Sequence, residues 1–170
     1  MICRIRPYRA DDAQALYEAA RESIPDVFPW LAWCHPDYSM AEAVDWTRSK
    51  AGPGSDGELI FAVVGPNDQL LGGCGVNQIN RIHRFGNLGY WVRSSATGRG
   101  VARAAVRLTA ELVFETTDLV RLEIVCAVGN RRSQRVAEAV GAAREGVLQK
   151  RLLLHGEPVD AVMYSLVRPS

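Results

Sequence analysis

The sequence predicts an α/β (α+β) fold, in which helices cover the faces of one mixed sheet. Segments that alternate apolar and polar residues, as strands do, are interspersed with segments whose apolar residues recur three and four positions apart, as in helices. Three strand-like segments follow one another between residues 59 and 93, with short turns between them. Along the whole chain these patterns predict about seven strands and about four helices.

The first fifty residues predict one strand and two helices. Residues 2–8 alternate apolar and basic side chains, as in a half-exposed strand, and Asp11 or Asp12 can then cap a helix. The segment 24–38, "IPDVFPWLAWCHPDY", contains three prolines, which argue for an irregular, aromatic stretch and against a long helix. A second helix is expected from a cap at Ser39 to about Lys50.

The rest of the chain predicts a meander, then two strand–helix units and a final pair of strands. Residues 52–57 predict a loop, and strands are expected at 59–64, 70–79 and 84–93. A helix from about 100 to 115, a strand at 119–128 and a helix from 130 to 140 follow. Gly141 ends this last helix, and the tail predicts two strands on either side of Gly156.

Length and composition are those of one ordinary globular domain spanning residues 1–170. The chain is 48% hydrophobic and 23% charged with a formal net charge of +1, so it lacks the basic excess expected of a nucleic-acid binder. No stretch approaches the ~20 apolar residues of a membrane span. We therefore expect neither a nucleic acid nor a membrane as a partner.

The cysteines indicate a reducing compartment. Four of them lie far apart with no C-x-x-C pair, at Cys3, Cys34, Cys74 and Cys126. This spacing favours neither a metal site nor a disulfide framework. The N-terminal residues carry charges where a signal peptide would carry its apolar region. A cytoplasmic protein without a metal is expected.

Residues 89–106, "GYWVRSSATGRGVARAAV", change from a strand pattern to a helix pattern around Gly98-Arg99-Gly100. The N-terminus of a helix leaves N–H groups unpaired and carries about half a positive charge, so a turn there binds an anion when the backbone comes close. Glycine permits that approach, and Arg99 and Arg103 add charge. A phosphate or pyrophosphate would fit, although a tight turn alone also explains two glycines. Neither the Walker A run nor the dinucleotide G-x-G-x-x-G pattern is present.

A second feature follows the strand that ends near residue 128, in the run "GNRRSQRVAEAVGAA". Asn130 can cap the next helix, and Ser133 lies on the same helical face as Val136, Ala137 and Val140. Ser133 is therefore expected to face inward. By itself such a serine is an ordinary helix-compatible polar residue; after an anion-binding turn it becomes a candidate for chemistry.

These features together resemble the GNAT acetyltransferase superfamily. Gly98-Arg99-Gly100-Val101-Ala102 resembles its acyl-CoA pyrophosphate loop, and Asn130 to Ser133 followed by Gly141 resembles its next motif. With "GYWV" at 89–92 and the tail "GEPVDAVMYSLV", the chain is similar to the branch that includes the ribosomal-protein N-terminal acetyltransferases RimJ and RimL. The resemblance implies the GNAT fold, with a mixed and mostly antiparallel sheet. Two departures are Thr97, where Gln or Arg usually opens the loop, and Ala137, where many members carry a tyrosine.

The resemblance implies that acetyl-CoA is the cosubstrate and that an N-acetyltransferase reaction moves its acetyl group to a primary amine by direct attack. It implies no metal and leaves room for a homodimer. Ser133 is implied as the proton donor to the departing thiolate, and a backbone N–H near Val92 as the oxyanion donor. A bulged strand that splays from its neighbour is implied beside the pantetheine arm. The implied cofactor-binding residues are Tyr90, Trp91, Val92, Arg93, Gly98, Arg99, Gly100, Val101, Ala102, Arg103, Asn130 and Ser133.

The general base stays open. Many relatives place a glutamate on the central strands, but this chain has Asn87 two positions before Gly89, and an amide does not accept a proton at neutral pH. Glu123 on the next strand is the first candidate, and His83, whose unperturbed pKa is near 6.5, is the second. Each also has an ordinary interpretation, as a surface charge pair and as a turn residue. A chain of waters could also deprotonate the amine.

The acceptor side is expected at the aromatic segment of residues 28–38, because the resemblance places that region along the cleft. Its substrate-binding candidates are Phe28, Trp30, Trp33 and Tyr38, which could equally tie the first helices to the sheet. Without a firm base the enzyme should favour the α-amine of a peptide or protein N-terminus, whose pKa is near 8 against about 10.4 for lysine. The alternatives are a small amine, such as an amino acid, a polyamine or an aminoglycoside, or a non-catalytic CoA-binding module.

Overall fold

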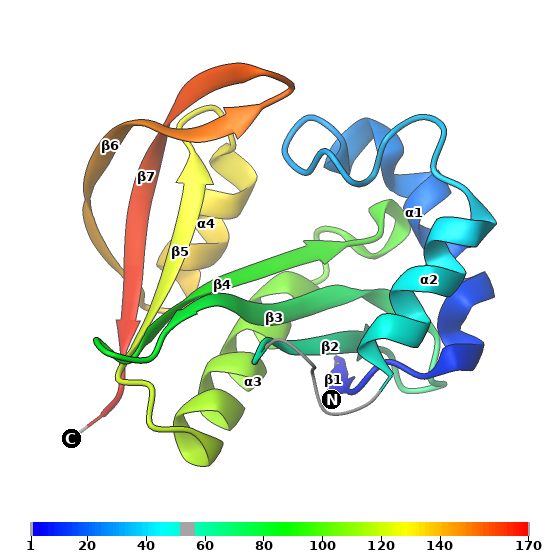
Figure 1. Cartoon of the computed structure of the whole chain (residues 1–170), viewed down its shortest axis with the longest axis horizontal. Coiled ribbons are helices and arrows are strands. Elements are labelled where there is room, and N and C mark those ends of the chain that lie inside the picture. Colours follow the sequence, from blue (N-terminus) through cyan, green and yellow to red (C-terminus); the bar gives the residue numbers. More distant parts are fainter. Residues whose placement is uncertain (1, 52–56, 170) are drawn as a thin grey trace.

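The computed structural model describes residues 2–51 and 57–169, and these residues form one seven-stranded mixed sheet with four α-helices (Figure 1). The sheet order is β1-β2-β3-β4-β5-β7-β6. The strands are β1 (Arg4–Arg6), β2 (Leu59–Val64), β3 (Leu70–Asn80), β4 (Phe85–Val92), β5 (Arg121–Ala127), β6 (Ala143–Leu154) and β7 (Glu157–Val167). The helices are α1 (Ala13–Val27), α2 (Met40–Lys50), α3 (Val101–Thr116) and α4 (Arg131–Ala139). The predicted α/β class and mostly antiparallel sheet are confirmed.

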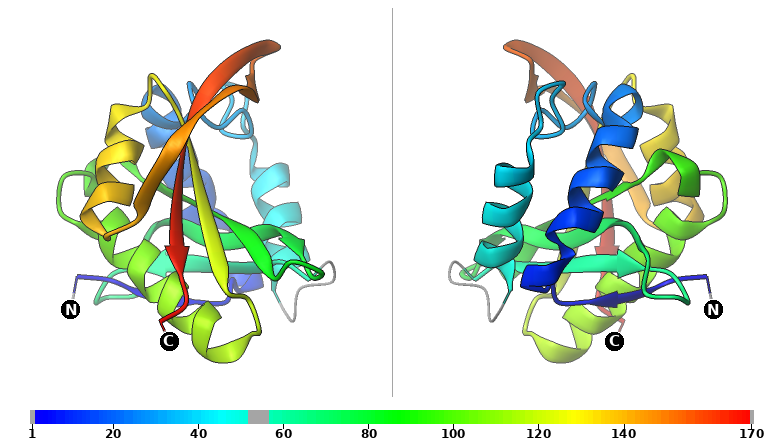
Figure 2. Two further views of the ribbon diagram at one scale, coloured as in Figure 1. Left: turned by 90° about the vertical axis from the view of Figure 1, so that its left-hand side faces the viewer. Right: turned by 90° about the vertical axis from the view of Figure 1, so that its right-hand side faces the viewer.

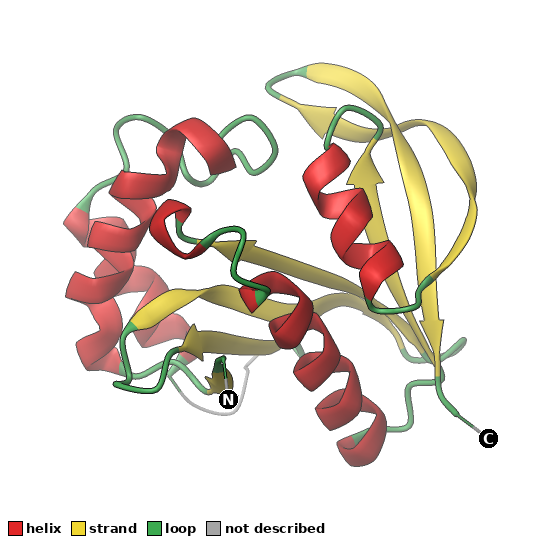
Figure 3. Cartoon of the chain, turned by 180° about the vertical axis from the view of Figure 1, so that it is seen from behind, coloured by secondary structure: helices red, strands yellow, loops and turns green. Residues whose placement is uncertain are grey.

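The helices lie in two layers on opposite faces of the sheet (Figures 2 and 3). One layer holds α1 and α2, and the other holds α3 and α4. Strand β4 serves both layers because its side chains alternate between the two faces. Its Leu88 and Tyr90 pack into the cluster with α3, whereas Trp91 packs into the cluster of α1 and α2. Within the described residues, no helix is both long enough and apolar enough to cross a bilayer.

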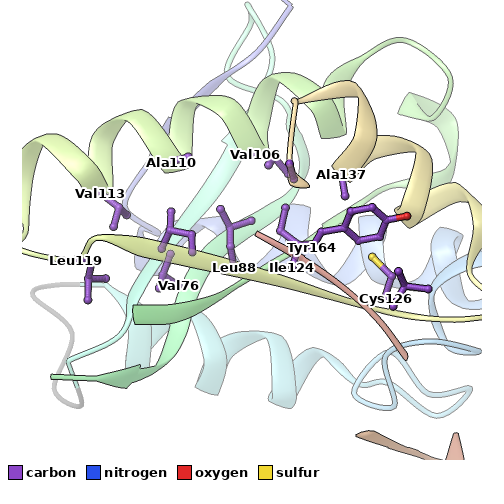
Figure 4. Close-up of a cluster of buried hydrophobic side chains, with 13 residues drawn as sticks. Val76, Leu88, Val106, Ala110, Val113, Leu119, Ile124, Cys126, Ala137 and Tyr164 are labelled. Carbon is purple, nitrogen blue, oxygen red and sulfur yellow. The ribbon is translucent and has the colours of Figure 1, made fainter. Parts of the chain in front are cut away.

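The largest part of the core lies between α3, α4 and the central strands (Figure 4). Val106, Ala110 and Val113 are the residues with which α3 covers β4 and β5. Ala137 of α4 is fully buried in the same cluster beside Tyr164. The residue that replaces the family's tyrosine is therefore packed in the core.

Strands β4 and β5 form a parallel pair over three residues only, Phe85–Asn87 with Arg121–Glu123. Beyond this point β4 stays paired with β3, and β5 with β7, so the two halves of the sheet diverge (Figure 1). Arg93 N–H donates to the Leu71 carbonyl, and antiparallel pairs alternate along the strands. The backbone groups of Tyr90 and Val92 therefore point away from β3, into the opening that we call the fork.

Three sequence predictions about the first half of the chain need correction. Helix α1 continues to Val27, past the expected end before residue 24, because Pro25 falls in its last turn and removes a single N–H donor. Asp12 does not cap α1 with its side chain: its carboxylate accepts the Arg9 N–H of a short 3-10 turn at Ala10–Asp12. The strand expected at 2–8 is only three residues long. The loop predicted at 52–57 lies mostly outside the described residues.

The bulge was expected in β4, but the structure has it in β3. Along Leu88–Val92 the register of β4 with β3 is regular, and the register shift lies on β3, between Asn77 and Asn80. Gln78, within that shift, has a positive φ of 49°. The separation of strands that the resemblance implied is present. It arises because the pairing of β4 with β5 ends after Asn87, and Leu88–Val92 contains no bulge.

One buried ion pair joins β1 to the start of α1. The Arg6 guanidinium donates to both oxygens of Asp12, each at 2.7 Å, and both side chains are about nine-tenths buried. Burial by itself would raise the pKa of Asp12, but the hydrogen bonds from Arg6 and from the Arg9 N–H outweigh it and lower that pKa.

We expect Asp12→Asn to lower the free energy of unfolding at pH 7 by about 2 kcal/mol, because the buried Arg6 would lose its bidentate partner and keep only the more exposed Asp68 as an anion. The depressed pKa means that the pair stabilises the fold above about pH 4 and loses this effect as pH falls through the native pKa. Urea titrations of both proteins should therefore converge at low pH. Asp11→Asn, at an exposed neighbour, is the control; a pH-independent difference would contradict the assignment.

Candidate functional site

A cavity of about 670 Å³ occupies the fork. Its walls come from β4, the turn before α3, the end of β5, the start of α4, the last turn of α1 and part of β6. Its lining includes Asp26, Trp30, Asn87, Tyr90, Trp91, Val92, Thr97, Gly98, Gly100, Val101, Ala102, Arg103, Cys126, Asn130, Arg132, Ser133, Arg135, Arg151, Leu152 and Leu154. Most of the residues predicted to bind the cofactor are thus brought to one place.

The glycine turn enters α3 with two residues in the left-handed region. Gly98 has a φ of 73° and Gly100, the N-cap of α3, has a φ of 79°. No side chain caps the helix, and Ala104 makes the bond to the Gly100 carbonyl that opens it. The N–H groups of Val101, Ala102 and Arg103 precede this bond, and all three residues line the cavity. The turn therefore presents helix N–H groups and a partial positive charge to the cavity.

Helix α4 brings a polar cluster to the opposite side of the fork. Asn130 Oδ1 accepts the Ser133 N–H at 3.1 Å, as the predicted cap requires. Ser133 Oγ lies 2.8 Å from the Tyr90 hydroxyl and 3.1 Å from Cys126 Sγ. Burial raises the pKa of both Tyr90 and Cys126, so both side chains stay neutral at physiological pH. Ser133 thus lies between two neutral groups that line the cavity.

A segment that we call the strap, residues 26–33, crosses the open end of the fork. On the β4 side, Ser94 Oγ donates to Asp26 at 2.6 Å and the rings of Trp33 and Trp91 are 5.2 Å apart. On the other side, the Arg132 guanidinium of α4 donates to Asp26 at 2.9 Å. The strap therefore joins the two diverging halves of the sheet.

The β6–β7 hairpin reaches the same strap. Its tip is a two-residue turn in which His155 and Gly156 both have positive φ, as a type I′ turn requires. His155 Nε2–H donates to the Phe28 carbonyl at 2.9 Å, and the two rings are 4.3 Å apart. Trp30 also packs on the β5–α4 loop: a Cβ added to Gly129 would lie 3.3 Å from the Trp30 ring. Figure 1 shows the loop after α1 and the hairpin facing one another above the fork.

Several predicted site residues do not line the cavity. Arg93 is turned toward Glu22, and this ion pair holds the pKa of Glu22 at about 2. Arg99 of the glycine turn is outside the lining, unlike its two neighbours. Phe28, Trp33 and Tyr38 are outside the lining as well. Tyr38 is buried against Trp33, and Phe28 packs on His155, so these side chains support the strap and do not face the cavity.

The two candidate bases also lie away from the cavity wall. Glu123 Oε1 accepts from Arg121 at 2.9 Å, in the ordinary role of a charge pair. It is the register partner of Asn87, which does line the cavity and donates to Asn77 at 2.9 Å. His83 is exposed in the β3–β4 turn, where its backbone N–H donates to Asn80. Among the residues described, no group of three or more His, Cys, Asp or Glu side chains is placed to hold a metal ion.

Sequence reasoning missed the residues that come to the site from distant elements. Gln78 and the hairpin residues Arg151, Leu152 and Leu154 carry no local pattern that marks them, and nothing within the motif at 130–133 marks Arg132 as part of the cavity wall. Cys126 had one usable signal, since it lies near the carboxyl end of the strand that precedes α4. His155 had none, because its contact with Phe28 spans 127 residues of sequence.

Comparison with known proteins identifies the family. The model of the acetyltransferase (GNAT) domain matches residues 3–143. The chain therefore belongs to the GNAT acetyltransferase family, and it is an acyltransferase with N-acetyltransferase activity.

The relatives agree with this assignment. A Bacillus subtilis protein named "Putative ribosomal N-acetyltransferase YdaF" is 28% identical over 170 residues, which cover 96% of this chain and 90% of that protein. The ribosomal-protein-serine acetyltransferase of Escherichia coli is 28% identical over 100 residues, covering 59% of this chain and 56% of that one. The fold is shared with RimL, the ribosomal L7/L12 alpha-N-protein acetyltransferase, solved with coenzyme A: TM-score 0.85, 20% identity, 98% of this chain and 94% of that chain.

We expect His155→Ala to loosen the strap, because the substitution removes one hydrogen bond and one ring contact. The Trp30 and Leu31 amides, which bond to the Val27 carbonyl, should exchange with deuterium roughly fivefold faster, as expected for a loss of about 1 kcal/mol. Leu153→Ala, at a neighbouring residue that is 70% exposed, is the control. Equal exchange in all three proteins would show that the hairpin does not hold the strap.

Proposed function

We propose that this enzyme transfers the acetyl group of acetyl-CoA to the α-amine of a peptide or protein N-terminus. One observation carries the proposal: a single cavity is lined on one side by the glycine turn of α3 and on the other by Ser133 of α4. The first side suits the pyrophosphate of the cofactor and the second suits its sulfur. We further propose that residues 1–170 act as one domain, because β6 and β7 complete the sheet beyond the family match.

The cofactor would lie along the fork, from the glycine turn to Ser133. The pyrophosphate would accept hydrogen bonds from the N–H groups of Val101 to Arg103, and Arg103 would add charge. The pantetheine arm, which is amide-like, would pair with the free backbone groups of Tyr90 and Val92. The Val92 N–H is our proposed donor to the tetrahedral oxyanion, since it points into the opening.

The reaction would need little from a base. The attacking amine must be neutral, and an α-amine with a pKa near 8 is already partly neutral at pH 7. With Glu123 held by Arg121 and His83 exposed, we propose that the amine loses its proton to solvent before or during attack. The departing thiolate would take its proton from Ser133.

The charges of the cavity disfavour a polyamine. Asp26 is the one acidic residue among its described lining residues, and it is already paired with Arg132. The arginines of the lining are Arg103, Arg132, Arg135 and Arg151. A polycation would meet a cationic wall, whereas a peptide N-terminus carries one amine and extends away through the opening. The relatives named above act on ribosomal proteins by their names, which supports a protein acceptor.

We also propose a reducing compartment such as the cytoplasm, because all four cysteines are buried free thiols. The homodimer stays a prediction. The outer strand β6 would be its natural interface, since it exposes Val147, Leu148 and Leu153.

We expect Gly100→Val to weaken CoA binding at least tenfold in calorimetry. A Cβ at this position would face Ile2, 3.6 Å away, so the effect would come from backbone strain: valine does not tolerate a φ of 79°, and the turn would move the N–H groups of Val101 to Arg103. Gly141→Val is the matched control, since Gly141 has a φ of 81°, open space around it and no place in the cavity wall. Equal CoA affinity in both variants would refute the pyrophosphate assignment.

The acceptor is tested by release of free thiol from acetyl-CoA with three amines: a peptide that begins with Ala or Ser, spermidine, and Nα-acetyl-lysine. At pH 7 we expect kcat/KM for the peptide to exceed that for the lysine side chain by about 10²-fold, the ratio of their neutral fractions. Faster turnover of spermidine would support the small-amine alternative. Binding of CoA without any thiol release would support a non-catalytic module.

A further inference from the structure

The Tyr90 hydroxyl contacts two oxygen atoms of Ser133, and the reaction proposed above assigns no role to Tyr90 beyond its backbone. Its hydroxyl lies 2.8 Å from Ser133 Oγ and 3.1 Å from the Ser133 carbonyl oxygen. One phenol proton can therefore be donated to either of two oxygens of the same residue. Tyr90, Ser133 and Cys126 all line the cavity, so this choice is made where the sulfur of the cofactor would lie.

The two choices leave the Ser133 proton in different places. When the phenol donates to the Ser133 carbonyl, its own oxygen can accept the Ser133 O–H, and that proton is then engaged by Tyr90 and not offered to a group in the cavity. When the phenol donates to Ser133 Oγ, the Ser133 O–H is free to point at a group in the cavity. A negative sulfur in the cavity favours the second arrangement, because charge-assisted hydrogen bonds are the stronger ones.

The backbone around both residues is fixed, so the change needs only rotation of two hydroxyl groups. Asn130 fixes the first turn of α4 through the Ser133 N–H, and β3 fixes β4 on the side away from the fork. Cys126 Sγ, 3.1 Å from Ser133 Oγ, occupies another side of the serine. Side chains of β4 and β5 thus bracket the Ser133 hydroxyl in the fork.

We propose that Tyr90 is the positioning residue that turns the Ser133 hydroxyl toward the departing sulfur and replaces the proton that Ser133 gives up. The inference rests on the function proposed above. As the C–S bond breaks, its electron pair stays on sulfur, which takes the Ser133 proton. Ser133 Oγ takes the Tyr90 proton, and the phenolate is reprotonated through water by the proton that the amine has lost. The net change is one proton moved from amine to thiol.

The acidities of the groups agree with this order. A phenol, with an ordinary pKa near 10, is a far stronger acid than an aliphatic hydroxyl, so a Ser133 alkoxide would draw its proton. Burial raises the pKa of Tyr90, so the phenol carries its proton at neutral pH. Burial likewise raises the pKa of Cys126, which keeps a competing thiolate out of the site.

The first test compares Tyr90→Phe with a matched control. We expect Tyr90→Phe to lower kcat by 10- to 100-fold, with KM for acetyl-CoA within about twofold of the parent, as for loss of an interaction made in the transition state. Tyr164→Phe is the control, because Tyr164 also joins the sheet to α4, donating to Glu138 at 2.9 Å, but does not line the cavity. Equal losses in the two variants would mean that Tyr90 merely anchors α4 and would overturn the proposal.

A double-mutant cycle tests whether Tyr90 acts through Ser133. With Ser133→Ala already in place, adding Tyr90→Phe should lower kcat no further. A double variant whose loss in kcat equals the product of the two single losses would contradict the proposal. Tyr90→3,5-difluorotyrosine keeps the hydroxyl and makes it a stronger acid, so kcat should stay within a few-fold of the parent value; a loss as large as that in Tyr90→Phe would also contradict the proposal.

A second measurement needs no acceptor. In the complex with CoA alone, the thiol is titrated by thiolate absorbance, and a donated hydrogen bond should lower its pKa. The thiol pKa should rise in Tyr90→Phe and stay at the parent value in Tyr164→Phe; no rise would overturn the proposal. A rise in Tyr90→Phe with no peptide acetylated would support the role of Tyr90 and contradict the acceptor assignment. Failure of the parent to bind CoA would contradict both.

Discussion

The short parallel contact between β4 and β5 is the constraint on which the rest of the site depends. Only Phe85–Asn87 and Arg121–Glu123 are paired, while β3 holds β4 and β7 holds β5 along the remainder of each strand. Each half-sheet follows its own right-handed twist, so the strands separate beyond the contact. The opening leaves backbone groups of β4 unpaired by another strand. Such backbone groups must be satisfied by water or by a bound ligand, and the amide groups of the pantetheine arm that we propose here would replace that water.

The same constraint directs two helix N-termini at one cavity. Helix α3 follows β4 and α4 follows β5, so both helices begin where the strands have diverged. The open end of the fork therefore receives the positive ends of two helix dipoles, together with Arg103, Arg132 and Arg135. The net charge of the chain is only +1, so this cationic character comes from the arrangement of the elements and is not visible in composition.

Sequence reasoning succeeded where a feature is encoded by neighbouring residues. The glycine turn and the Asn130 cap are local, because a φ above zero and an N-cap each depend on a few adjacent residues. It failed where packing decides. Pro25 was expected in an irregular segment, yet it lies in the last turn of α1. The Tyr90–Ser133 contact spans 43 residues and the Phe28–His155 contact spans 127, and no local pattern predicts either.

The two ends of the cavity differ in how firmly they are built. The side that we propose for the cofactor rests on α3, whose Val101, Ala105 and Val106 are buried in the core. The strap is fastened at the rim, where the Asp26–Arg132 pair is largely exposed and contributes little. On the side of the hairpin and α4, its position depends on packing of Phe28 with His155 and of Trp30 over Gly129. Substitutions at these few residues can reshape the acceptor opening without disturbing the fork. If the proposed cofactor site and acceptor opening hold, one cofactor site could thus serve different amines, since function changes most readily in segments outside the core.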